Sequence, residues 1–193
     1  FLQFDLYFGA AEARGAKLTP TVLVLKAIIA ALKTYPQFNA SLDVAANEVI
    51  IKQYINLSIA VDTERGLLVP VIKDVDRKNI YDLAVELGDL GERTRSNRVS
   101  PDELQGGTFS VTNLGSLGGG SFTPIVNHPE VAILGIGQGR EKAMVVDGRI
   151  EPRLMLPLCL SYDHRVVDGA DGVRFLNKIV ESIQDPEHVL LGG

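Results

Sequence analysis

The residues most able to do chemistry lie in the segment LSYDHRVVDG, Leu160 to Gly169. There His164 stands between Asp163 and Arg165, shortly after an apolar run from Leu154 to Leu160. This pattern predicts an imidazole at the point where a buried strand emerges. Imidazole exchanges protons near neutral pH, so a histidine in such a place can act as a general base. A lone histidine is more often structural, and residue type alone leaves both interpretations open.

Acyl transfer to an external thiol is a reaction that these residues could support. Asp168 follows His164 by four positions, and three hydroxyl groups stand earlier in the chain, on Ser110, Thr112 and Ser116. A free thiol has a pKa near ~8.5, so a nearby imidazole can take its proton at neutral pH. The thiolate would attack a thioester while a hydroxyl stabilises the oxyanion, and the protein need supply no nucleophile.

Other chemistries fit the sequence poorly. The glycines from Gly115 to Gly120 and the run Gly135-x-Gly-x-Gly139 match neither a phosphate loop nor a dinucleotide motif, so a tight turn or close backbone approach is expected. Gly115 to Gly118 also has the wrong spacing for a nucleophile elbow. The three His and one Cys are scattered, which predicts no metal site. Cys159 lies in an apolar run and is expected to be a buried, inert thiol.

The composition is that of an ordinary globular domain. With 193 residues, 46% hydrophobic and 22% charged, the chain suits one domain with its own core. A net charge of −5 without a basic stripe predicts no nucleic-acid partner. The longest apolar stretch, Val22 to Leu32, contains Lys26 and is too short to cross a bilayer, so no membrane partner is expected. One cysteine and no signal peptide favour a bacterial cytoplasm or a mitochondrial matrix.

Helix and strand patterns must position these residues. Capping signals predict three helices: Pro20 to about Tyr35 after the cap Thr19, a helix capped by Asn79, and a short one opened by Ser100-Pro101-Asp102-Glu103. An amphipathic pattern predicts a fourth helix from Asp171 to Gln184. Alternation and β-branching predict strands at Phe1–Phe8, Glu48–Lys52, Tyr54–Asp62, Leu67–Ile72, Thr108–Asn113, Val131–Gly137, Ala143–Val146 and Arg149–Arg153. Asp147-Gly148, between the last two of these strands, predicts a two-residue hairpin turn. We expect the first helix to be buried on more than one side, residues 37–43 to be a loop, and Pro70 to mark an edge or bulge. A single α/β (or α+β) domain with a mixed sheet follows.

Four segments, taken together, carry a family resemblance. They are NASLD at Asn39–Asp43, AVDTERGLLVPVIKDVDRK at Ala60–Lys78, GGTFSVTNLGSLGGGSFTPIVNHPEVAILGIG at Gly106–Gly137, and SYDHRVVDGADGVRFL at Ser161–Leu176. In this order they resemble the dihydrolipoamide acyltransferases, the core component of 2-oxo acid dehydrogenase complexes, whose signature is D-H-R-x-x-D-G. The resemblance covers roughly Leu18 to the C-terminus.

The resemblance implies a chloramphenicol-acetyltransferase-like fold, assembled as a homotrimer with the active site in a channel between subunits. Coenzyme A, a substrate, would enter from one end and a lipoyl arm from the other. On this chain, His164 matches the general base and Thr112 the oxyanion-stabilising hydroxyl, supplied by the neighbouring subunit. Asp168 matches the Asp or Asn that orients the His loop. Arg165 is expected to form a structural ion pair, and no coenzyme-binding residue can be carried over.

The domain organisation is interpreted in the same way. Residues 1–193 are expected to be one acyltransferase catalytic domain, short before Leu18 and without a lipoyl or peripheral-subunit-binding domain. Because the chain begins with Phe1 and has no Asp-Lys-Ala lipoylation motif, we interpret it as a fragment whose lipoyl group comes from a separate domain. The run Asp185–Gly193 resembles the tail that joins trimers, so a higher-order core with other complex components as partners is expected.

Several alternatives stay open at this stage. The segments Asn113–Gly115 and Phe122–Asn127 look most like the bacterial pyruvate-type enzymes, so acetyl is the expected acyl group. Branched-chain and succinyl specificity are the alternatives within the family. Beyond it stand a catalytically impaired scaffold that only builds the core, and an antibiotic-modifying acetyltransferase that shares the fold.

Overall fold

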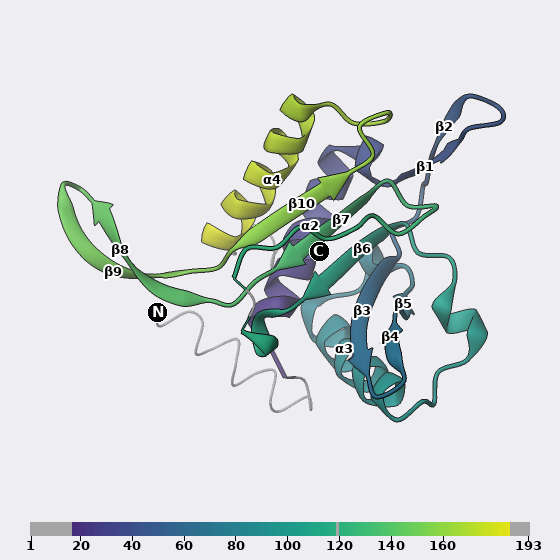
Figure 1. Cartoon of the computed structure of the whole chain (residues 1–193), viewed down its shortest axis with the longest axis horizontal. Coiled ribbons are helices and arrows are strands. Elements are labelled where there is room, and N and C mark those ends of the chain that lie inside the picture. Colours follow the sequence, from purple (N-terminus) through teal and green to yellow (C-terminus); the bar gives the residue numbers. More distant parts are fainter. Residues whose placement is uncertain (1–16, 119, 186–193) are drawn as a thin grey trace.

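A mixed six-stranded sheet forms the centre of the molecule, and helices pack against it (Figure 1). The computed structural model describes residues 17–118 and 120–185, so the predicted strand Phe1–Phe8 and most of the run Asp185–Gly193 lie outside it. The strand order is β10-β7-β6-β3-β4, with β5 also paired to β3. β3, β6 and β7 are parallel to one another, whereas β10, β4 and β5 run antiparallel to their neighbours. The predicted α/β fold with a mixed sheet and flanking helices is confirmed.

The strands, helices and turns of the described residues have the following bounds. The strands are β1 Ala40–Asp43, β2 Glu48–Ile51, β3 Leu57–Thr63, β4 Gly66–Leu68, β5 Val71–Ile72, β6 Phe109–Asn113, β7 Ala132–Ile136, β8 Arg140–Val146, β9 Arg149–Met155 and β10 Leu158–Tyr162. The α-helices are α2 Pro20–Thr34, α3 Ile80–Arg95 and α4 Gly169–Gln184. Short 3₁₀ turns are η1 Pro36–Phe38, η2 Val75–Arg77, η3 Pro101–Leu104 and η4 Gly115–Leu117.

The helices begin close to their predicted caps. The Thr19 side chain accepts a hydrogen bond from the backbone N–H of Val22, which opens α2. Asn79 Oδ1 accepts from two backbone N–H groups in the first turn of α3, at 2.9 and 3.0 Å. The capping box at Ser100 is present at η3. Because each cap satisfies donors that the first helical turn leaves free, these short side chains fix where the helices start.

Helix α2 is buried on several sides, as predicted. Its buried residues are Val22, Val24, Leu25, Lys26, Ala27, Ile28, Ile29, Ala31 and Leu32. Lys26 is 4% exposed, its Nζ donates to the Lys78 carbonyl at 3.1 Å, and burial lowers the pKa of its amine. Beyond the end of α2, Phe38 stacks on Phe175 of α4 with ring centroids 4.1 Å apart. This aromatic pair joins α4 to the chain that leaves α2.

The expected loop at residues 37–43 is wrong. Ala40–Asp43 forms β1, which pairs antiparallel with β2. The hairpin is held at its base by Asn39, whose side-chain amide donates to the carbonyls of Lys52 and Tyr54 at 3.0 and 2.8 Å. The segment ASLD has no β-branched residue, so its local propensity does not predict a strand. The strand forms because β2 pairs with it.

The strand after the hairpin β8–β9 also differs from expectation. The apolar run from Leu154 to Leu160 is split, because β9 ends at Met155 and β10 begins at Leu158 after Pro157. β10 is an edge strand and half-buried along its length, not a buried core strand. Cys159 is accordingly half-buried, which corrects the expectation of a buried thiol. Periodicity identified an apolar strand but could not tell an edge from the centre of the sheet.

Two turn predictions are confirmed. Asp147 and Gly148 adopt φ of 50° and 76°, the left-handed pair that a two-residue hairpin turn requires, and β8–β9 extends away from the body (Figure 1). Pro70 lies in the gap between β4 and β5, where it interrupts the edge of the sheet.

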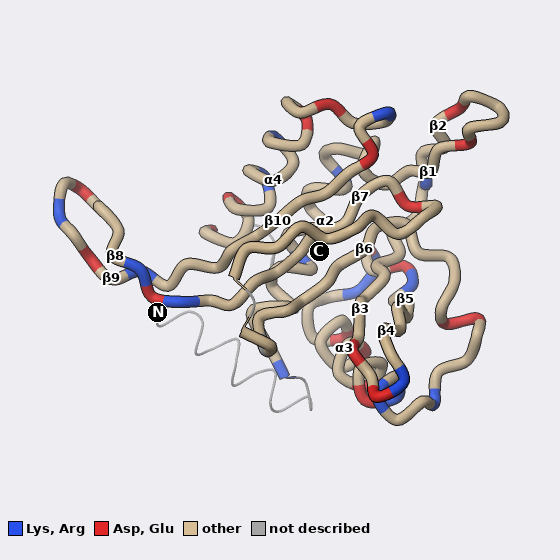
Figure 2. The backbone as a smooth tube through the Cα atoms, in the orientation of Figure 1, with Lys and Arg blue, Asp and Glu red and all other residues tan. Residues whose placement is uncertain are grey.

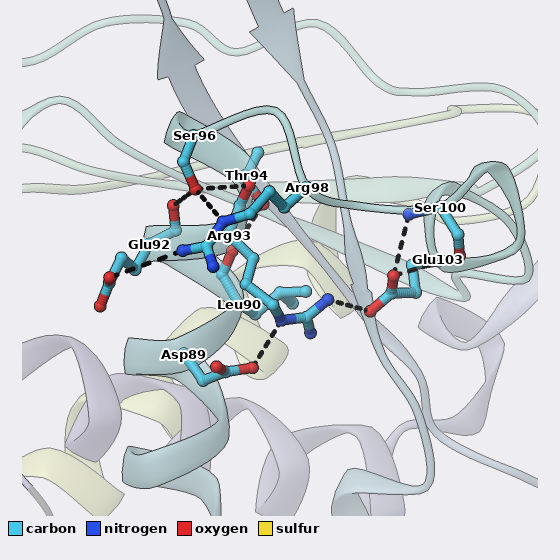
Figure 3. A network of polar contacts seen from close by, with 9 residues as sticks. All are labelled: Asp89, Leu90, Glu92, Arg93, Thr94, Ser96, Arg98, Ser100 and Glu103. Carbon is cyan, nitrogen blue, oxygen red and sulfur yellow. Dashed lines mark hydrogen bonds and ion pairs between the residues drawn. The ribbon is translucent and has the colours of Figure 1, made fainter.

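Charge lies mainly outside the central strands. Figure 2 shows Lys, Arg, Asp and Glu along α3, α4 and the two hairpins, whereas β6, β7 and β10 contain none. At the end of α3, Arg93 forms ion pairs with Asp89 at 2.7 Å and with Glu103 at 2.6 Å (Figure 3). The backbone N–H of Ser100, followed by Arg93, lowers the pKa of Glu103 to about 2. This network ties α3 to η3.

Candidate active site

His164 lies in a closed turn between β10 and α4. The Asp163 carbonyl accepts from the N–H groups of Val166 and Val167 at 3.0 and 3.1 Å, and the Asp163 carboxylate accepts from the Arg165 N–H at 3.0 Å. The His164 side chain is exposed. The sequence DHRVV therefore forms a turn whose backbone is fixed by hydrogen bonds and whose imidazole faces outward.

The expected ion pair of Arg165 is present. Its guanidinium meets both carboxylate oxygens of Asp163, with Nη2 to Oδ2 at 2.6 Å. This contact lowers the pKa of Asp163 and leaves that carboxylate charged across the neutral range. Arg165 thus stabilises the turn beside His164.

Asp168 fixes the other end of the turn. It is the N-cap of α4, and its Oδ1 accepts from the Asp171 N–H at 2.8 Å. One turn later, a Cβ on Gly172 would lie 2.7 Å from the ring of Tyr162, so only glycine lets α4 approach β10 so closely. The Tyr162 ring lies 5.7 Å from the His164 imidazole. Within the described residues no hydrogen bond joins Asp168 to His164, so in one chain Asp168 positions the turn through the cap.

The hydroxyl candidates differ in what they contact. Ser110 is 1% exposed, and its Oγ donates to the buried carboxyl of Glu130. The side chain of Ser116 lies outside what the structure describes. Thr112, on the same strand as Ser110, is half-buried and faces a groove. Of the described candidates, Thr112 is therefore the hydroxyl that a substrate can reach.

The groove at Thr112 has a volume of about 390 Å³ and lies between α3 and the ends of β3 and β6. Its lining is mainly apolar, with one cation, Arg95, and one acid, Asp62. The lining residues are Ile59, Ala60, Val61, Asp62, Leu67, Pro70, Leu87, Gly88, Leu90, Gly91, Arg95, Thr112, Asn113, Leu114 and Leu117. Such a groove suits an extended, partly apolar ligand that ends near a hydroxyl.

Thr112 and His164 lie far apart in one chain. Thr112 is the register partner of Gly135 on β7, and Gly135 is the register partner of Cys159 on β10. His164 comes five positions after Cys159 in the sequence. From a strand spacing of about 4.8 Å and a rise of about 3.4 Å per residue, the two residues are roughly 10 Å apart across the sheet and roughly 17 Å apart along it. A single reacting carbonyl cannot contact both. The chain brings together His164 and the Asp168 turn, but not Thr112.

The glycine-rich segments pack backbone against backbone. A Cβ on Gly137 would lie 2.3 Å from the Gly120 carbonyl oxygen, and one on Gly115 would lie 2.9 Å from the Gly137 oxygen. A Cβ on Gly135 would lie 2.8 Å from the ring of Phe122. The expected close backbone approach is confirmed, and it holds the chain beyond Thr112 against the end of β7.

Sequence reasoning missed Glu130. This residue is 6% exposed, and its two carboxylate oxygens accept hydrogen bonds from Ser58 and Ser110. The only local signal is the glycine pair before β6, because Gly107 leaves the space that the Ser58–Glu130 contact fills. No motif marks a lone buried acid.

Among residues 17–118 and 120–185, no three His, Cys, Asp or Glu side chains gather as metal ligands would. In the same residues, no helix has both the length and the apolar character needed to span a bilayer.

Comparison with known sequences places the chain near one family. Residues 7–191 match the family described as 2-oxoacid dehydrogenases acyltransferase (catalytic domain). The dihydrolipoyllysine-residue acetyltransferase component of the pyruvate dehydrogenase complex from Bacillus subtilis is 47% identical over 181 residues, or 94% of this chain. This chain spans only 41% of that protein's length. The corresponding component from Staphylococcus aureus is 46% identical and is spanned to 43%.

Solved structures agree. The Azotobacter vinelandii dihydrolipoamide acetyltransferase has a TM-score of 0.90 and 45% identity, covering 95% of this chain and 75% of that one. The cubic core of the pyruvate dehydrogenase multienzyme complex gives the same values. A chloramphenicol acetyltransferase, at TM-score 0.57 and 16% identity over 91% of this chain and 81% of that one, shares the fold.

The Azotobacter enzyme also permits a comparison of spacing. A serine, a histidine and an asparagine have been investigated for their role in its catalytic mechanism. The serine precedes the histidine by 52 positions and the asparagine follows it by four. Thr112, His164 and Asp168 are spaced identically, with Thr in place of Ser and Asp in place of Asn.

Proposed function

The chain belongs to the 2-oxoacid dehydrogenase acyltransferases, as their catalytic domain, and from this we propose that it transfers an acyl group between a dihydrolipoyl thiol and coenzyme A. Acetyl is the group we favour, because the similar curated proteins act in pyruvate dehydrogenase complexes. Both thiols are substrates. The lipoyl group would be carried by a separate domain, since no lipoylation motif occurs in these residues.

One observation carries the proposal: the matched residues His164 and Thr112 lie at opposite ends of the sheet of one chain. An active site that uses both must therefore take His164 from one chain and Thr112 from another. A homotrimer with a site at each interface meets this requirement, because a cyclic assembly brings one surface of a chain against a different surface of the next.

The proposed chemistry follows from the groups present. The His164 imidazole takes the proton of the attacking thiol, and the sulfur forms a bond to the thioester carbonyl carbon. The Thr112 hydroxyl of the neighbouring subunit donates to the oxyanion of the tetrahedral intermediate. When the intermediate collapses, the carbon–sulfur bond of the original thioester breaks, and the leaving thiolate takes the proton back from His164. Asp168 keeps the His164 turn in place by capping α4.

The groove at Thr112 gives the thiol arms a path. Its apolar lining suits the extended arm of coenzyme A, whose thiol would lie near Thr112, and the cation at Arg95 suits the phosphates at the opposite end of that arm. We extend the proposal to a higher-order core, supported by the similarity to a cubic core structure, with lipoyl domains and other complex components as partners. A bacterial cytoplasm is the compartment we favour, because the similar curated proteins are bacterial.

The test is a transfer assay with acetyl-coenzyme A and dihydrolipoamide. We expect His164→Asn to lose transfer by roughly 10²- to 10⁴-fold, the usual contribution of a general base, while particle mass is unchanged. His128→Asn is the matched control, because His128 is an exposed histidine that is not part of the turn from Asp163 to Asp168. Retained transfer in His164→Asn contradicts the mechanism.

The same assay separates the alternatives. Particles that assemble but transfer nothing, even without substitution, indicate a scaffold. A panel of acetyl, succinyl and branched-chain acyl donors decides the acyl group. Faster turnover of chloramphenicol than of dihydrolipoamide would indicate an antibiotic-modifying acetyltransferase.

A further inference from the structure

A buried carboxyl joins the two strands next to the proposed oxyanion hydroxyl. Glu130 Oε2 accepts from Ser110 Oγ on β6 at 2.5 Å, and Oε1 accepts from Ser58 Oγ on β3. Ser58 and Ser110 are register partners, and all three residues are at most 6% exposed. Among the described residues no Lys or Arg pairs with Glu130. Burial raises the pKa of this carboxyl, and the two hydroxyl donors oppose the rise.

The surrounding backbone is shaped for this contact. A Cβ on Gly107 would lie 1.8 Å from Ser58 Oγ and 2.5 Å from Glu130 Oε1, so any other residue there would displace the carboxyl. Glu130 is also bridged through its backbone to Ser41 of β1. The carboxyl therefore occupies a fixed place among three strands, and it is not a stray charge at the end of a loop.

Glu130 is linked indirectly to both parts of the proposed site, the strand that carries Thr112 and the turn that carries His164. On one side, Ser110 precedes Thr112 by two positions, so both side chains point from the same face of β6. On the other side, the next residue, Val131, accepts a hydrogen bond through its carbonyl from the Asp163 N–H at 2.8 Å, where the His164 turn begins.

We propose that Glu130 is a positioning residue for the acyl transfer, holding the strand of Thr112 and the turn of His164 at a set spacing within each chain. This inference rests on the proposed function. In a cyclic assembly each chain gives Thr112 to one site and His164 to another, so the spacing inside the chain governs the geometry of both sites. Glu130 acts by accepting hydrogen bonds from two serine hydroxyls at once, and it takes no proton from the substrate.

The test compares reach with charge at one position. Glu130→Gln keeps the reach, since its amide accepts from one serine and donates to the other. Glu130→Asp keeps the charge but is one methylene shorter and cannot reach both serines. We expect the Gln variant to stay within about 3-fold of the wild-type kcat, whereas the Asp variant falls roughly 10- to 100-fold, the cost of misplacing a reacting group by about 1 Å. KM for both substrates should change by less than about 2-fold, because neither serine lines the groove at Thr112.

A serine variant supplies the second arm. Ser110→Ala should lower kcat as Glu130→Asp does. Ser182→Ala is its control, because Ser182 is also a buried serine (7% exposed), bonded only within α4 to the Lys178 carbonyl. Particle mass and thermal unfolding are recorded for every variant, so that a loss of kcat in intact particles is distinguished from misfolding.

The experiment distinguishes failure of the positioning role of Glu130 from failure of the proposed acyl-transfer function. If the unsubstituted protein transfers acyl groups but the Asp variant is active and the Gln variant is not, charge matters and the positioning role is wrong. Equal kcat in Ser110→Ala and Ser182→Ala overturns it as well. If the unsubstituted protein does not transfer at all, the proposed function fails instead.

Discussion

Mixing two inactive variants tests directly whether the active site is shared between chains. Thr112→Ala removes the hydroxyl and His164→Ala removes the base, so each variant alone should be inactive. In one chain these residues lie roughly 10 Å apart across the sheet and roughly 17 Å apart along it, so the proposed mechanism requires two chains to complete each site. Mixed trimers, however, contain interfaces where an intact His164 meets an intact Thr112.

The expected recovery follows from counting interfaces. When the two variants assemble at random in equal amounts, about one interface in four joins an intact base to an intact hydroxyl, so about a quarter of wild-type activity should return. The matched control mixes wild type with the double variant, which also leaves about a quarter of the interfaces intact. A site within one chain gives a different pair of values: none for the first mixture and about half for the control.

The assay is co-expression of the two chains in equal amounts, purification on a tag that every chain carries, and transfer of acetyl from acetyl-coenzyme A to dihydrolipoamide. Activity is expressed per mole of chain, and mass measurement confirms that mixed particles were obtained. No recovery in mixed particles, together with about half activity in the control, would refute the shared site.

Three further predictions concern the fold around the site. The pKa of Glu103 is about 2 in the folded chain against an ordinary 4.5, so its stabilisation is present above pH 4.5 and lost as pH falls toward 2; Glu103→Gln should flatten that part of a curve of thermal unfolding against pH. Gly172→Ala should destabilise the chain by about 1–3 kcal/mol in urea unfolding and slow transfer, because the new Cβ meets the Tyr162 ring 2.7 Å away. Asn79→Ala should cost about 1 kcal/mol in the same unfolding experiment, since the first turn of α3 loses its cap.

The first two of these predictions have matched controls. Glu92→Gln removes only a long, exposed ion pair of 3.7 Å and should leave the acid dependence as it is. For the unfolding measurement the control is Gly88→Ala, which places a Cβ in open space on α3 and should stabilise the helix by about 1 kcal/mol. A Gly172→Ala variant as stable and as active as wild type would show that α4 does not need its close approach to β10. An unchanged Asn79→Ala would show that the α3 cap is dispensable.

The sequence predicted the helices well because their signals are local. Thr19, Asn79 and Ser100 each act on N–H groups within three positions, so the cap can be read without knowing the fold. The hairpin turn at Asp147-Gly148 is local in the same sense. In contrast, β1 exists because β2 lies beside it, and the half-burial of β10 depends on its place at the edge of the sheet. Neither the pairing of β1 nor the half-burial of β10 can be predicted from the residues of that strand alone.

The candidate site shows the same division. His164 stands out by its charged neighbours, and the family resemblance selected Thr112 from three hydroxyls. What could not be predicted was that they lie at opposite ends of one sheet, because that depends on the strand order. Glu130 was missed for a related reason: its partners Ser58 and Ser110 are 72 and 20 positions away, and only the paired strands bring them together.

The distance between Thr112 and His164 has a consequence for when the protein becomes competent. On the proposed shared site, a chain that has just folded holds a finished turn and a finished strand, and the site becomes complete only when a neighbouring chain binds. Folding and activation are then separate events in time, and the second depends on how many chains are present. Dilution that separates the chains should abolish acyl transfer while every helix and strand remains intact. The specific activity would then measure the degree of assembly.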